Sequence, residues 1–299
     1  MNFIKMKRVG VIGLGNIANR HRENLKKIFP EADIFAMSSR GRNTKDVIPS
    51  CDYFVNKTED LINANVELVI VASPASYHAK HALPLISASI PVLIEKPVTT
   101  NLEDINKLLN ASKKHKTPTS VAYCLRYLPS AKKIRDLLAK ETIGKIHNSF
   151  VEVGQYLPNW RQNKNYRKTV SANPILGGGA LFELSHELDY IQWILGNLTI
   201  NSAILRSSDT LKLEVEDIVD VVSTVKKQTV VSIHLDFLQQ FPFRQCKFIG
   251  SKGCINWNLL KDKIILYNIN GQKTLFENKE INNNDIYVNM VLDFLSLIK

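Results

Sequence analysis

The first 120 residues alternate short apolar runs with segments of helical periodicity. The runs of strand length are Val9–Ile12, Ile34–Met37, Leu68–Ala72, Val92–Ile94 and Thr119–Ala122. Between them, Ala79–Ser87 and Leu102–His115 carry apolar residues at helical spacing, and Asn101 is a predicted N-cap for the second helix. Strands that alternate with helices indicate βαβ units, and therefore a parallel sheet with right-handed crossovers.

The pattern changes after Tyr123. Helices are predicted over Ser130–Lys140, Ala180–Leu195 and Asn284–Ile298. Predicted strands are Ile146–Tyr156, Thr199–Arg206, Ile218–Lys226, Thr229–Leu238, Gln245–Ile249, Cys254–Trp257 and Ile264–Asn268. Connections of hairpin length, such as residues 226–228 and 250–253, favour an antiparallel sheet in this half. A polar loop is predicted over residues 157–176.

Lys96 is a candidate functional residue because of where it stands. It lies between Glu95 and Pro97, and Glu95 directly follows an apolar run of residues 90–94. A charged amine at the end of a buried strand is costly unless it contacts something, so the position indicates chemistry. The alternative is a salt-bridged lysine at a strand end.

The segment Gly13–Ala18 has the G-x-G-x-x-A form of a dinucleotide fingerprint. It follows a predicted strand and opens a predicted helix, which is the context that the fingerprint requires. Gly13 permits the tight turn, Gly15 lets the backbone approach a diphosphate, and Ala18 permits close packing of the helix on the sheet. We expect Gly13, Gly15, Asn16, Ile17 and Ala18 to line the cofactor. The alternative is a purely structural glycine turn.

The end of the second predicted strand bears on which dinucleotide binds. An NAD-binding chain usually has an acid there, whereas this chain has Ser38, Ser39, Arg40 and Arg42. Hydroxyl donors and arginines suit a 2′-phosphate. We therefore expect NADP(H) to be preferred over NAD(H); the alternative is a polar surface loop.

Composition narrows the class of protein. A chain of 299 residues, 44% of them hydrophobic, can bury the cores of two domains. No run approaches the roughly 18 apolar residues that cross a bilayer, and Met1–Lys7 is too short for a signal peptide. The four cysteines have no C-x-x-C spacing, so neither a metal site nor a disulfide framework is expected. A reduced, cytoplasmic, soluble protein without a metal is predicted.

The net charge of +11 raises the possibility of nucleic acid as a partner. The lysines are scattered in pairs, however, and no recognition helix, zinc finger or aromatic–basic motif occurs. No nucleic-acid partner is therefore predicted. The charge is interpreted as a solvated surface, or as a field that attracts anionic ligands.

Over essentially its whole length, the chain resembles the glucose–fructose oxidoreductase, inositol dehydrogenase and MocA superfamily. The motifs that carry the resemblance are Gly13–His21, Val71–Pro74 with His78, Glu95–Pro97, Tyr123 with Arg126–Tyr127, Gly177–Gly179 and His186–Asp189. The resemblance implies an α/β protein with an NAD(P)-binding Rossmann domain of parallel, doubly wound sheet at residues 1–122. It also implies an α+β domain with a largely antiparallel open sheet at residues 123–299, for substrate binding and oligomerisation.

Through this resemblance, Lys96 is expected beside the hydroxyl or carbonyl that reacts, and His186 at the catalytic histidine. A histidine can take the hydroxyl proton as hydride leaves, while Lys96 polarises the oxygen. A core histidine is the alternative for His186. The resemblance also implies a cis peptide bond at Pro97. The further implied contacts of the cofactor are Ser73, Pro74, His78, Glu95, Lys96 and Arg126.

One position departs from the family. Many members have an aspartate four residues before the catalytic histidine, where this chain has Phe182, with Glu183 three before. On one helix, the i, i+3 spacing would place Glu183 beside His186. Glu183 is therefore either a third catalytic residue or a solvent-facing one. Asp189 is a further candidate for orienting groups.

The predicted loop after residue 156 combines aromatic and cationic side chains, which suit sugars, bases, carboxylates or phosphates. A solvated loop is the alternative. The predicted substrate contacts are Lys96, Tyr123, Trp160, Arg161, Tyr166, Arg167, His186 and Asp189.

Together these features predict an NAD(P)-dependent oxidoreductase acting on a hydroxyl or keto group of a sugar, cyclitol or nucleotide-sugar. The resemblance further favours a role in surface-polysaccharide sugar metabolism. The rivals are a reductase of a non-sugar ligand, as in biliverdin reductase, and a non-catalytic cofactor-binding sensor. Apolar residues on both faces of Ile218–Val225 predict a homodimer, or a dimer of dimers, through that sheet.

Overall fold

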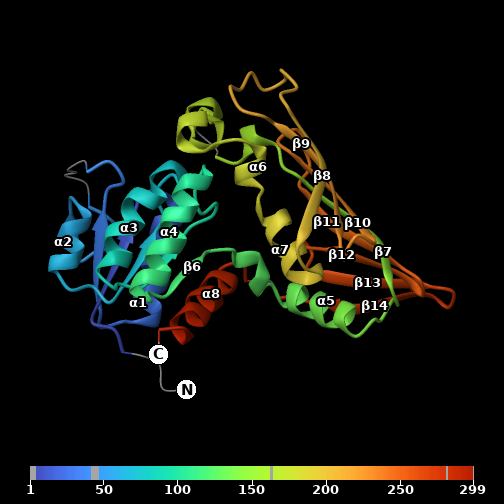
Figure 1. The fold of residues 1–299 in the computed structure, drawn as a ribbon, viewed down its shortest axis with the longest axis horizontal. Coiled ribbons are helices and arrows are strands. Elements are labelled where there is room, and N and C mark those ends of the chain that lie inside the picture. The colour runs from blue at the N-terminus through green and yellow to red at the C-terminus, as the bar shows by residue number, and fades with distance from the viewer. Residues whose placement is uncertain (1–4, 42–46, 162–163, 281, 299) are drawn as a thin grey trace. The chain divides into compact units, whose positions relative to one another are not determined.

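The computed structural model describes residues 5–41, 47–161, 164–280 and 282–298. The chain divides into two units, drawn in Figure 1. The first consists of Met1–Ala122, Ile175–Gly177 and Tyr287–Lys299, and the second of Tyr123–Pro174 and Gly178–Ile286. Each unit has its own sheet, and the expected combination of a parallel and a largely antiparallel sheet is confirmed.

The first unit is built on a six-stranded sheet in which every pair of neighbours is parallel. The strands are β1 (Arg8–Ile12), β2 (Asp33–Met37), β3 (Tyr53–Val55), β4 (Leu68–Val71), β5 (Val92–Ile94) and β6 (Thr119–Val121). Their order is β3-β2-β1-β4-β5-β6. The order reverses between β1 and β4, and in such sheets ligands bind at the carboxyl ends of the strands beside this switch point.

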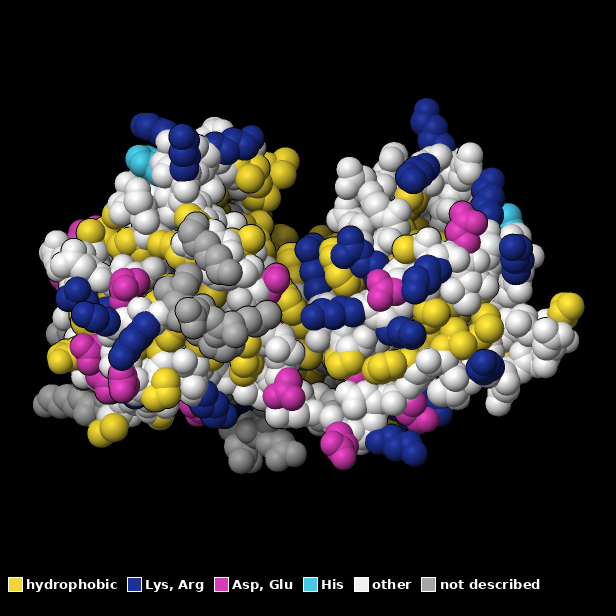
Figure 2. All heavy atoms as spheres, turned by 90° about the horizontal axis from the view of Figure 1, so that it is seen from below, with side chains coloured by type: hydrophobic (Ala, Val, Ile, Leu, Met, Phe, Trp, Pro, Cys, Tyr) yellow, Lys and Arg dark blue, Asp and Glu magenta, His cyan; other side chains and the backbone are white. Residues whose placement is uncertain are grey.

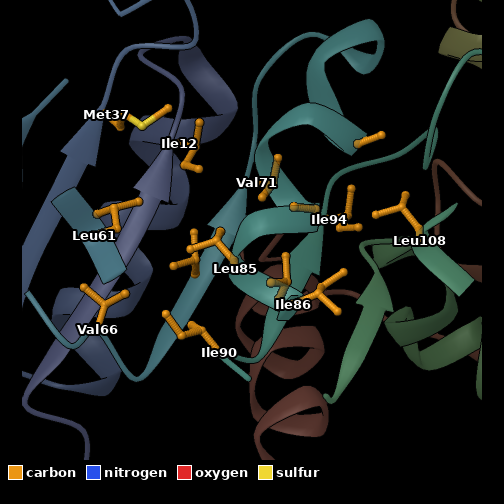
Figure 3. Packing of buried hydrophobic residues seen from close by; sticks show 14 of the residues in the cluster. Ile12, Met37, Leu61, Val66, Val71, Leu85, Ile86, Ile90, Ile94 and Leu108 are labelled. Carbon is orange, nitrogen blue, oxygen red and sulfur yellow. The ribbon is translucent and has the colours of Figure 1, made fainter. Parts of the chain in front are cut away.

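Helices cover the sheet because its strands are apolar on both faces. They are α1 (Asn16–Ile28), α2 (Thr58–Asn63), α3 (His78–Ser87) and α4 (Leu102–His115), and a short 3-10 turn, η1 (Ala75–Tyr77), precedes α3. Most of α8 (Asp285–Ser296) also belongs to this unit. Helix α1 packs on β1 and β2. On the other face, α2, α3 and α4 contribute to the cluster in Figure 3, which joins Leu61, Leu85 and Leu108 to Ile12 and Val71. Each such buried side chain contributes about 1.5–3 kcal/mol, which holds the strand ends in place.

The second unit is built on an eight-stranded sheet of order β14-β13-β12-β11-β7-β10-β9-β8. The strands are β7 (Ile146–Gly154), β8 (Leu198–Arg206), β9 (Ile218–Val225), β10 (Thr229–Asp236), β11 (Phe243–Gly250), β12 (Gly253–Asn258), β13 (Lys263–Asn268) and β14 (Gly271–Glu277). Strands β7 and β10 are parallel, and the other neighbours are antiparallel. The predicted description of a largely antiparallel sheet therefore holds.

One face of this second sheet is covered by helices, namely α5 (Pro129–Ala139), α6 (Ala180–Glu183) and α7 (His186–Leu195) (Figure 1). Strand β9 shows the difference between the faces, because Val219 and Val221 are buried while Val222, on the opposite face, is 43% exposed. Phe150 and Ile204 are also exposed, at 46% and 56%. We call this uncovered side the open face.

Several elements differ from those expected. Strands β3 and β14 and helix α2 were not predicted. The predicted loop 157–176 contains four 3-10 turns: η3 (Leu157–Asn159), η4 (Tyr166–Lys168), η5 (Val170–Ala172) and η6 (Pro174–Leu176). Most of α8 groups with the first unit, although the sequence placed residues 287–299 in the second domain. In α8 the Tyr287 ring lies 4.6 Å from the Arg20 guanidinium and edge-on to the His21 ring, both on α1.

On the face drawn in Figure 2, Lys and Arg side chains occur in several separate groups among acidic, apolar and uncharged ones. In the part of the chain that the structure describes, no helix has both the length and the apolar character needed to span a bilayer.

Candidate active site

The fingerprint turn depends on Gly13. Its φ of +127° is one that L side chains rarely adopt, and an added Cβ would lie 2.4 Å from the carbonyl oxygen of Ala72. The Gly13 amide donates to the Met37 carbonyl at 2.8 Å, which joins the turn to the end of β2. The glycine therefore lets the chain pass close to β4 at the switch point.

Gly15, unlike Gly13, is not closely packed against another part of the described chain. It is the N-cap of α1 with φ −77° and ψ 178°, and the first turn of α1 contains no acid. Among the described residues, no atom lies within 4 Å of an added Cβ, and no side chain caps the helix. Gly15 and Asn16 are exposed, and a helix N-terminus carries a partial positive charge. Gly15, Asn16 and Ile17 thus fit a dinucleotide diphosphate.

The end of β2 supplies the residues predicted to select the cofactor. Ser38 is buried, Ser39 is half-buried and Arg40 is exposed. The Arg40 amide donates to Ser38 Oγ at 3.4 Å, and the Gly41 amide donates to the Ser38 carbonyl at 3.1 Å, which forms a turn. Arg42 lies outside the described residues.

Two buried histidines of α3 hold the strand ends together. The ring nitrogens of His78 lie 2.7 Å from the carbonyl oxygen of Ser73 and 2.9 Å from that of Pro97, which joins the ends of β4 and β5. Burial lowers the pKa of His78, although both carbonyls favour its charged form. His81 Nδ1 lies 3.0 Å from Ser73 Oγ, and burial together with Lys80 lowers the pKa of His81 to about 4. The sequence did not single out His81.

The segment after β5 is built around a buried carboxylate. Glu95 is 7% exposed; its Oε1 lies 2.7 Å from His21 Nε2, and its Oε2 accepts from the Lys96 amide at 3.1 Å. Burial opposes the charge of Glu95, but the His21 hydrogen bond and the Lys96 charge outweigh it and hold the pKa of Glu95 below its usual value. Lys96 itself is half-buried. The predicted cis bond between Lys96 and Pro97 is confirmed.

In the second unit, Tyr123 and His186 lie together. Their ring centroids are 5.7 Å apart, with the planes at 76°. His186 is half-buried and is the first residue of α7. Burial raises the pKa of the Tyr123 phenol.

Arg126 and Asp189 form a bidentate ion pair. Arg126 follows Tyr123, and Asp189 follows His186, by three residues in the sequence. Arg126, on the 3-10 turn η2 (Cys124–Tyr127), donates from Nε to Asp189 Oδ2 at 2.8 Å and from Nη2 to Asp189 Oδ1 at 2.5 Å. The Asp189 side chain is 8% exposed and that of Arg126 is 40% exposed. Asp189 therefore orients a guanidinium that still reaches the surface of its unit.

The prediction of one continuous helix over Ala180–Leu195, carrying both Glu183 and His186, was wrong, because the segment forms two helices. Glu183 is the last residue of α6, and His186 begins α7 after a two-residue turn. The i, i+3 argument for one continuous helix therefore does not apply. Glu187, in the first turn of α7, is fully buried. Its carboxylate accepts from Arg244 Nε at 2.7 Å and from Arg244 Nη2 at 2.9 Å.

Glu216 is a residue that the sequence did not single out. Its carboxylate accepts from the Leu181 amide at 3.0 Å, which caps α6. At Gly179, with φ +111°, an added Cβ would lie 2.4 Å from Glu216 Oε1. The third glycine of the Gly177–Gly179 motif therefore makes room for this cap.

The aromatic and cationic loop makes contacts within its own unit. Tyr166 Oη and Arg167 Nε both donate to the Leu211 carbonyl at 3.1 Å. The Trp160 ring lies edge-on to Phe237, with centroids 5.2 Å apart, and Arg161 is half-buried. Tyr166 and Arg167 therefore support the loop, whether or not they also contact a ligand.

A second charged cluster lies on the open face. His234 Nδ1 is 2.6 Å from Asp220 Oδ1, and Nε2 is 3.2 Å from Asp236 Oδ2. The hydrogen bond to Asp236 raises the pKa of His234 to about 9, although burial opposes this, and Asp220 adds to the rise. Within the described residues, no group of three or more His, Cys, Asp or Glu side chains is arranged to hold a metal ion.

Residues 7–123 match the Gfo/Idh/MocA oxidoreductase family with NAD-binding Rossmann fold, and residues 131–256 match the Gfo/Idh/MocA C-terminal domain. A myo-inositol 2-dehydrogenase of Thermotoga maritima is 31% identical over 144 residues, which are 47% of this chain and 43% of that protein. The chain thus matches less than half the length of this relative.

Two further likenesses cover more of the chain. A glucose-6-phosphate 3-dehydrogenase of Bacillus subtilis is 24% identical over 248 residues, which are 76% of this chain and 67% of that protein. The solved structure of a levoglucosan dehydrogenase in complex with NADH superposes with a TM-score of 0.84 at 17% identity, covering 98% of this chain and 89% of that one. The motifs, the two sheets and the family matches agree, and the chain belongs to the Gfo/Idh/MocA oxidoreductase family.

Proposed function

We propose that the protein is an NAD(P)-dependent oxidoreductase that transfers hydride to or from a hydroxyl or keto carbon of a sugar, cyclitol or nucleotide-sugar. The observation that carries this proposal is Lys96, held by Glu95 at the end of β5 in a unit whose first helix begins uncapped at Gly15. The relatives act, by their names, on inositol and on glucose 6-phosphate. A role in surface-polysaccharide metabolism remains part of the proposal.

Each residue has a proposed role in the oxidation of a secondary alcohol. A bound nicotinamide would supply the acceptor for the hydride. Lys96 donates to the substrate oxygen and stabilises the charge that develops there, while His186 takes the hydroxyl proton. Glu183 is proposed to orient this centre. In the reverse direction, His186 returns the proton to the same oxygen.

Substrate binding is proposed for both units. In the second unit the Tyr123 ring contacts the His186 ring, and Asp189 follows His186 by three residues in the chain. The proposed loop contacts are Trp160, Arg161, Tyr166 and Arg167. Ser73, Pro74, His78, Glu95 and Arg126 are proposed as further cofactor contacts. We also propose a cytoplasmic homodimer, or a dimer of dimers, that assembles through the open face of residues 123–299.

For the cofactor we propose a preference for NADP(H). Ser38, Ser39 and Arg40 support it, since hydroxyls and a guanidinium suit a 2′-phosphate. Fluorescence titration should show tighter binding of NADPH than NADH, and Arg40→Ala should narrow the difference. Tighter binding of NADH by the unaltered protein would refute the preference.

The proposed activity is tested by a screen. Cyclitols, free sugars and nucleotide-sugars are offered with both oxidised cofactors, and their keto counterparts with both reduced cofactors, while the reduced nicotinamide band is followed. We expect reduction with at least one member of these classes. Cofactor that binds but is reduced or oxidised with none of them in either direction would favour a sensor and contradict the proposal.

A further inference from the structure

His21 is a fully buried residue of the helix that begins at the fingerprint. It lies on α1 after Ala18, and its side chain is 0% exposed. Its Nε2 lies 2.7 Å from Glu95 Oε1, across 74 residues of sequence. The Tyr287 ring of α8 packs edge-on against it at 6.2 Å. His21 therefore connects α1, to which it belongs, with α8 and with the end of β5.

The Glu95 carboxylate uses its two oxygens in two directions. Oε1 contacts His21, and Oε2 accepts from the backbone amide of Lys96 at 3.1 Å. A single carboxylate thus connects α1 to the backbone that carries the proposed reactive amine. Since α1 also offers the open N-terminus at Gly15, the connection joins the proposed cofactor site to Lys96 within one unit.

The other side of Lys96 is fixed as well. The carbonyl oxygen of Pro97 lies 2.9 Å from His78 Nδ1, and His78 is 1% exposed. The backbone on each side of Lys96 is therefore tied to a buried histidine, one from α1 and one from α3. Neither ring has to touch a ligand to have this effect.

We propose that His21 is a positioning residue for Lys96, which it holds in register with the cofactor-binding end of α1 through the Glu95 carboxylate. The proposal rests on the proposed function only in giving Lys96 its catalytic role. The link between His21, Glu95 and the Lys96 backbone concerns this chain alone, so it can be tested without a cofactor.

The charges around Glu95 define what happens when His21 is removed. The titratable groups that face the carboxylate are His21 from α1, His78 from α3 and Lys96 from its own segment. Burial is the largest influence on Glu95 and acts against its charge. Without His21 the carboxyl group should keep its proton to higher pH, and the Lys96 amide should lose a charged acceptor.

The first test uses the protein without cofactor. Amide hydrogen exchange is measured by NMR in His21→Phe, which keeps a ring but removes the donor, and in His21→Gln, which restores one. We expect exchange of the Lys96 amide to rise about tenfold or more in His21→Phe and to return close to its original rate in His21→Gln. The Glu95 amide, which donates to the Val71 carbonyl at 2.8 Å, serves as the internal reference and should not change.

Thr117→Val is the matched control. Thr117 is 3% exposed and donates to the Ile86 carbonyl at 2.7 Å. It lies in the same unit, but it precedes β6 and is not part of the segment that carries Lys96. This variant should lower stability without a selective change at the Lys96 amide. If His21→Phe does not fold, Glu95→Gln replaces it, and the same selective rise is expected because the charged acceptor is lost.

Kinetics provide the second readout. His21→Phe should lower kcat about tenfold or more and move the acid limb of kcat/KM to higher pH, with cofactor affinity changed by less than about threefold. His21→Gln should recover most of kcat. An unchanged Lys96 amide in both His21→Phe and Glu95→Gln would overturn the proposal, as would a change that Thr117→Val reproduces. Failure of the proposed function would instead leave the amide results intact and appear as full turnover in Lys96→Ala.

Discussion

Replacing Gly15 by alanine should separate cofactor binding from folding. The backbone at Gly15, with φ −77°, is one that alanine adopts freely, and among the described residues no atom lies within 4 Å of the added Cβ. The same methyl group, however, projects into the space beside the amide groups at the start of α1. A diphosphate held there would be pushed away from its donors.

The two effects differ in their expected size. At the N-cap of α1, alanine is less favourable than glycine by about 1 kcal/mol at most, so the melting temperature should fall by no more than roughly 4 °C. A hydrogen bond to a charged group contributes about 1.5–3 kcal/mol. The loss of one such bond to the diphosphate should weaken dinucleotide binding by about 10- to 100-fold.

Gly13→Ala is the contrasting variant. Its φ of +127° is strained for alanine, and the added Cβ would stand 2.4 Å from the Ala72 carbonyl oxygen, a backbone atom that cannot turn aside. Backbone strain of about 1–3 kcal/mol and overpacking of about 1–3 kcal/mol should together destabilise the first unit by about 2–6 kcal/mol. A fall of the melting temperature by at least roughly 4 °C is expected.

Thermal unfolding and fluorescence titration with NADPH and NADH measure both quantities on the same samples. Gly15→Ala should lose affinity for the dinucleotides while it keeps most of its stability, and Gly13→Ala should lose stability. Unchanged affinity in Gly15→Ala would mean that the diphosphate does not lie at this helix end. An unchanged melting temperature in Gly13→Ala would mean that the close approach to β4 is not needed.

Three further predictions concern the second unit. Glu187→Gln leaves the Arg244 guanidinium buried without its carboxylate, so urea unfolding should show a loss of about 3–5 kcal/mol; a loss below about 1 kcal/mol would contradict this. The folded-state pKa of His234, about 9, lies above its unfolded value. The stability that His234 contributes is therefore complete below about pH 6.5 and is lost as the pH rises through about 9. His234→Gln should flatten this decline of stability with pH, and an unaltered pH profile would argue against the Asp220 and Asp236 contacts. Val222→Lys on the open face should convert the proposed dimer to a monomer in light scattering, while the exposed turn variant Lys226→Ala should not; a monomeric parent protein would end the proposal of assembly.

The sequence predicts the first unit well because its signals are local. Continuous apolar runs identify β1, β4 and β5, and the Asn101 side chain caps α4 as expected, accepting from the Asp104 amide at 2.9 Å. Strand β14 was missed because Gln272, Lys273 and Thr274 are all exposed and give no apolar period. A three-residue strand such as β3 is too short for any periodicity to identify.

The contacts of the site could be predicted only in part. Glu95 and Lys96 stand out in the sequence, but the partner of Glu95 is His21, which lies 74 residues away. Glu187 and Arg244 are 57 residues apart, and no local pattern joins them. Each pair joins a helix to a strand or strand end that is distant in the sequence, and a single sequence does not specify how these elements pack.

The central claim is that Lys96 and His186 act together on the oxygen of a sugar-like substrate during hydride transfer. Single-turnover absorbance at the nicotinamide band, with a substrate found by the screen, measures that step in Lys96→Ala, His186→Ala and the double variant. Each single change should slow the step by about two to four powers of ten, the double variant should be little slower than either, and cofactor affinity should stay nearly constant. A near-normal rate in both single variants, with substrate and cofactor still bound, would contradict the account.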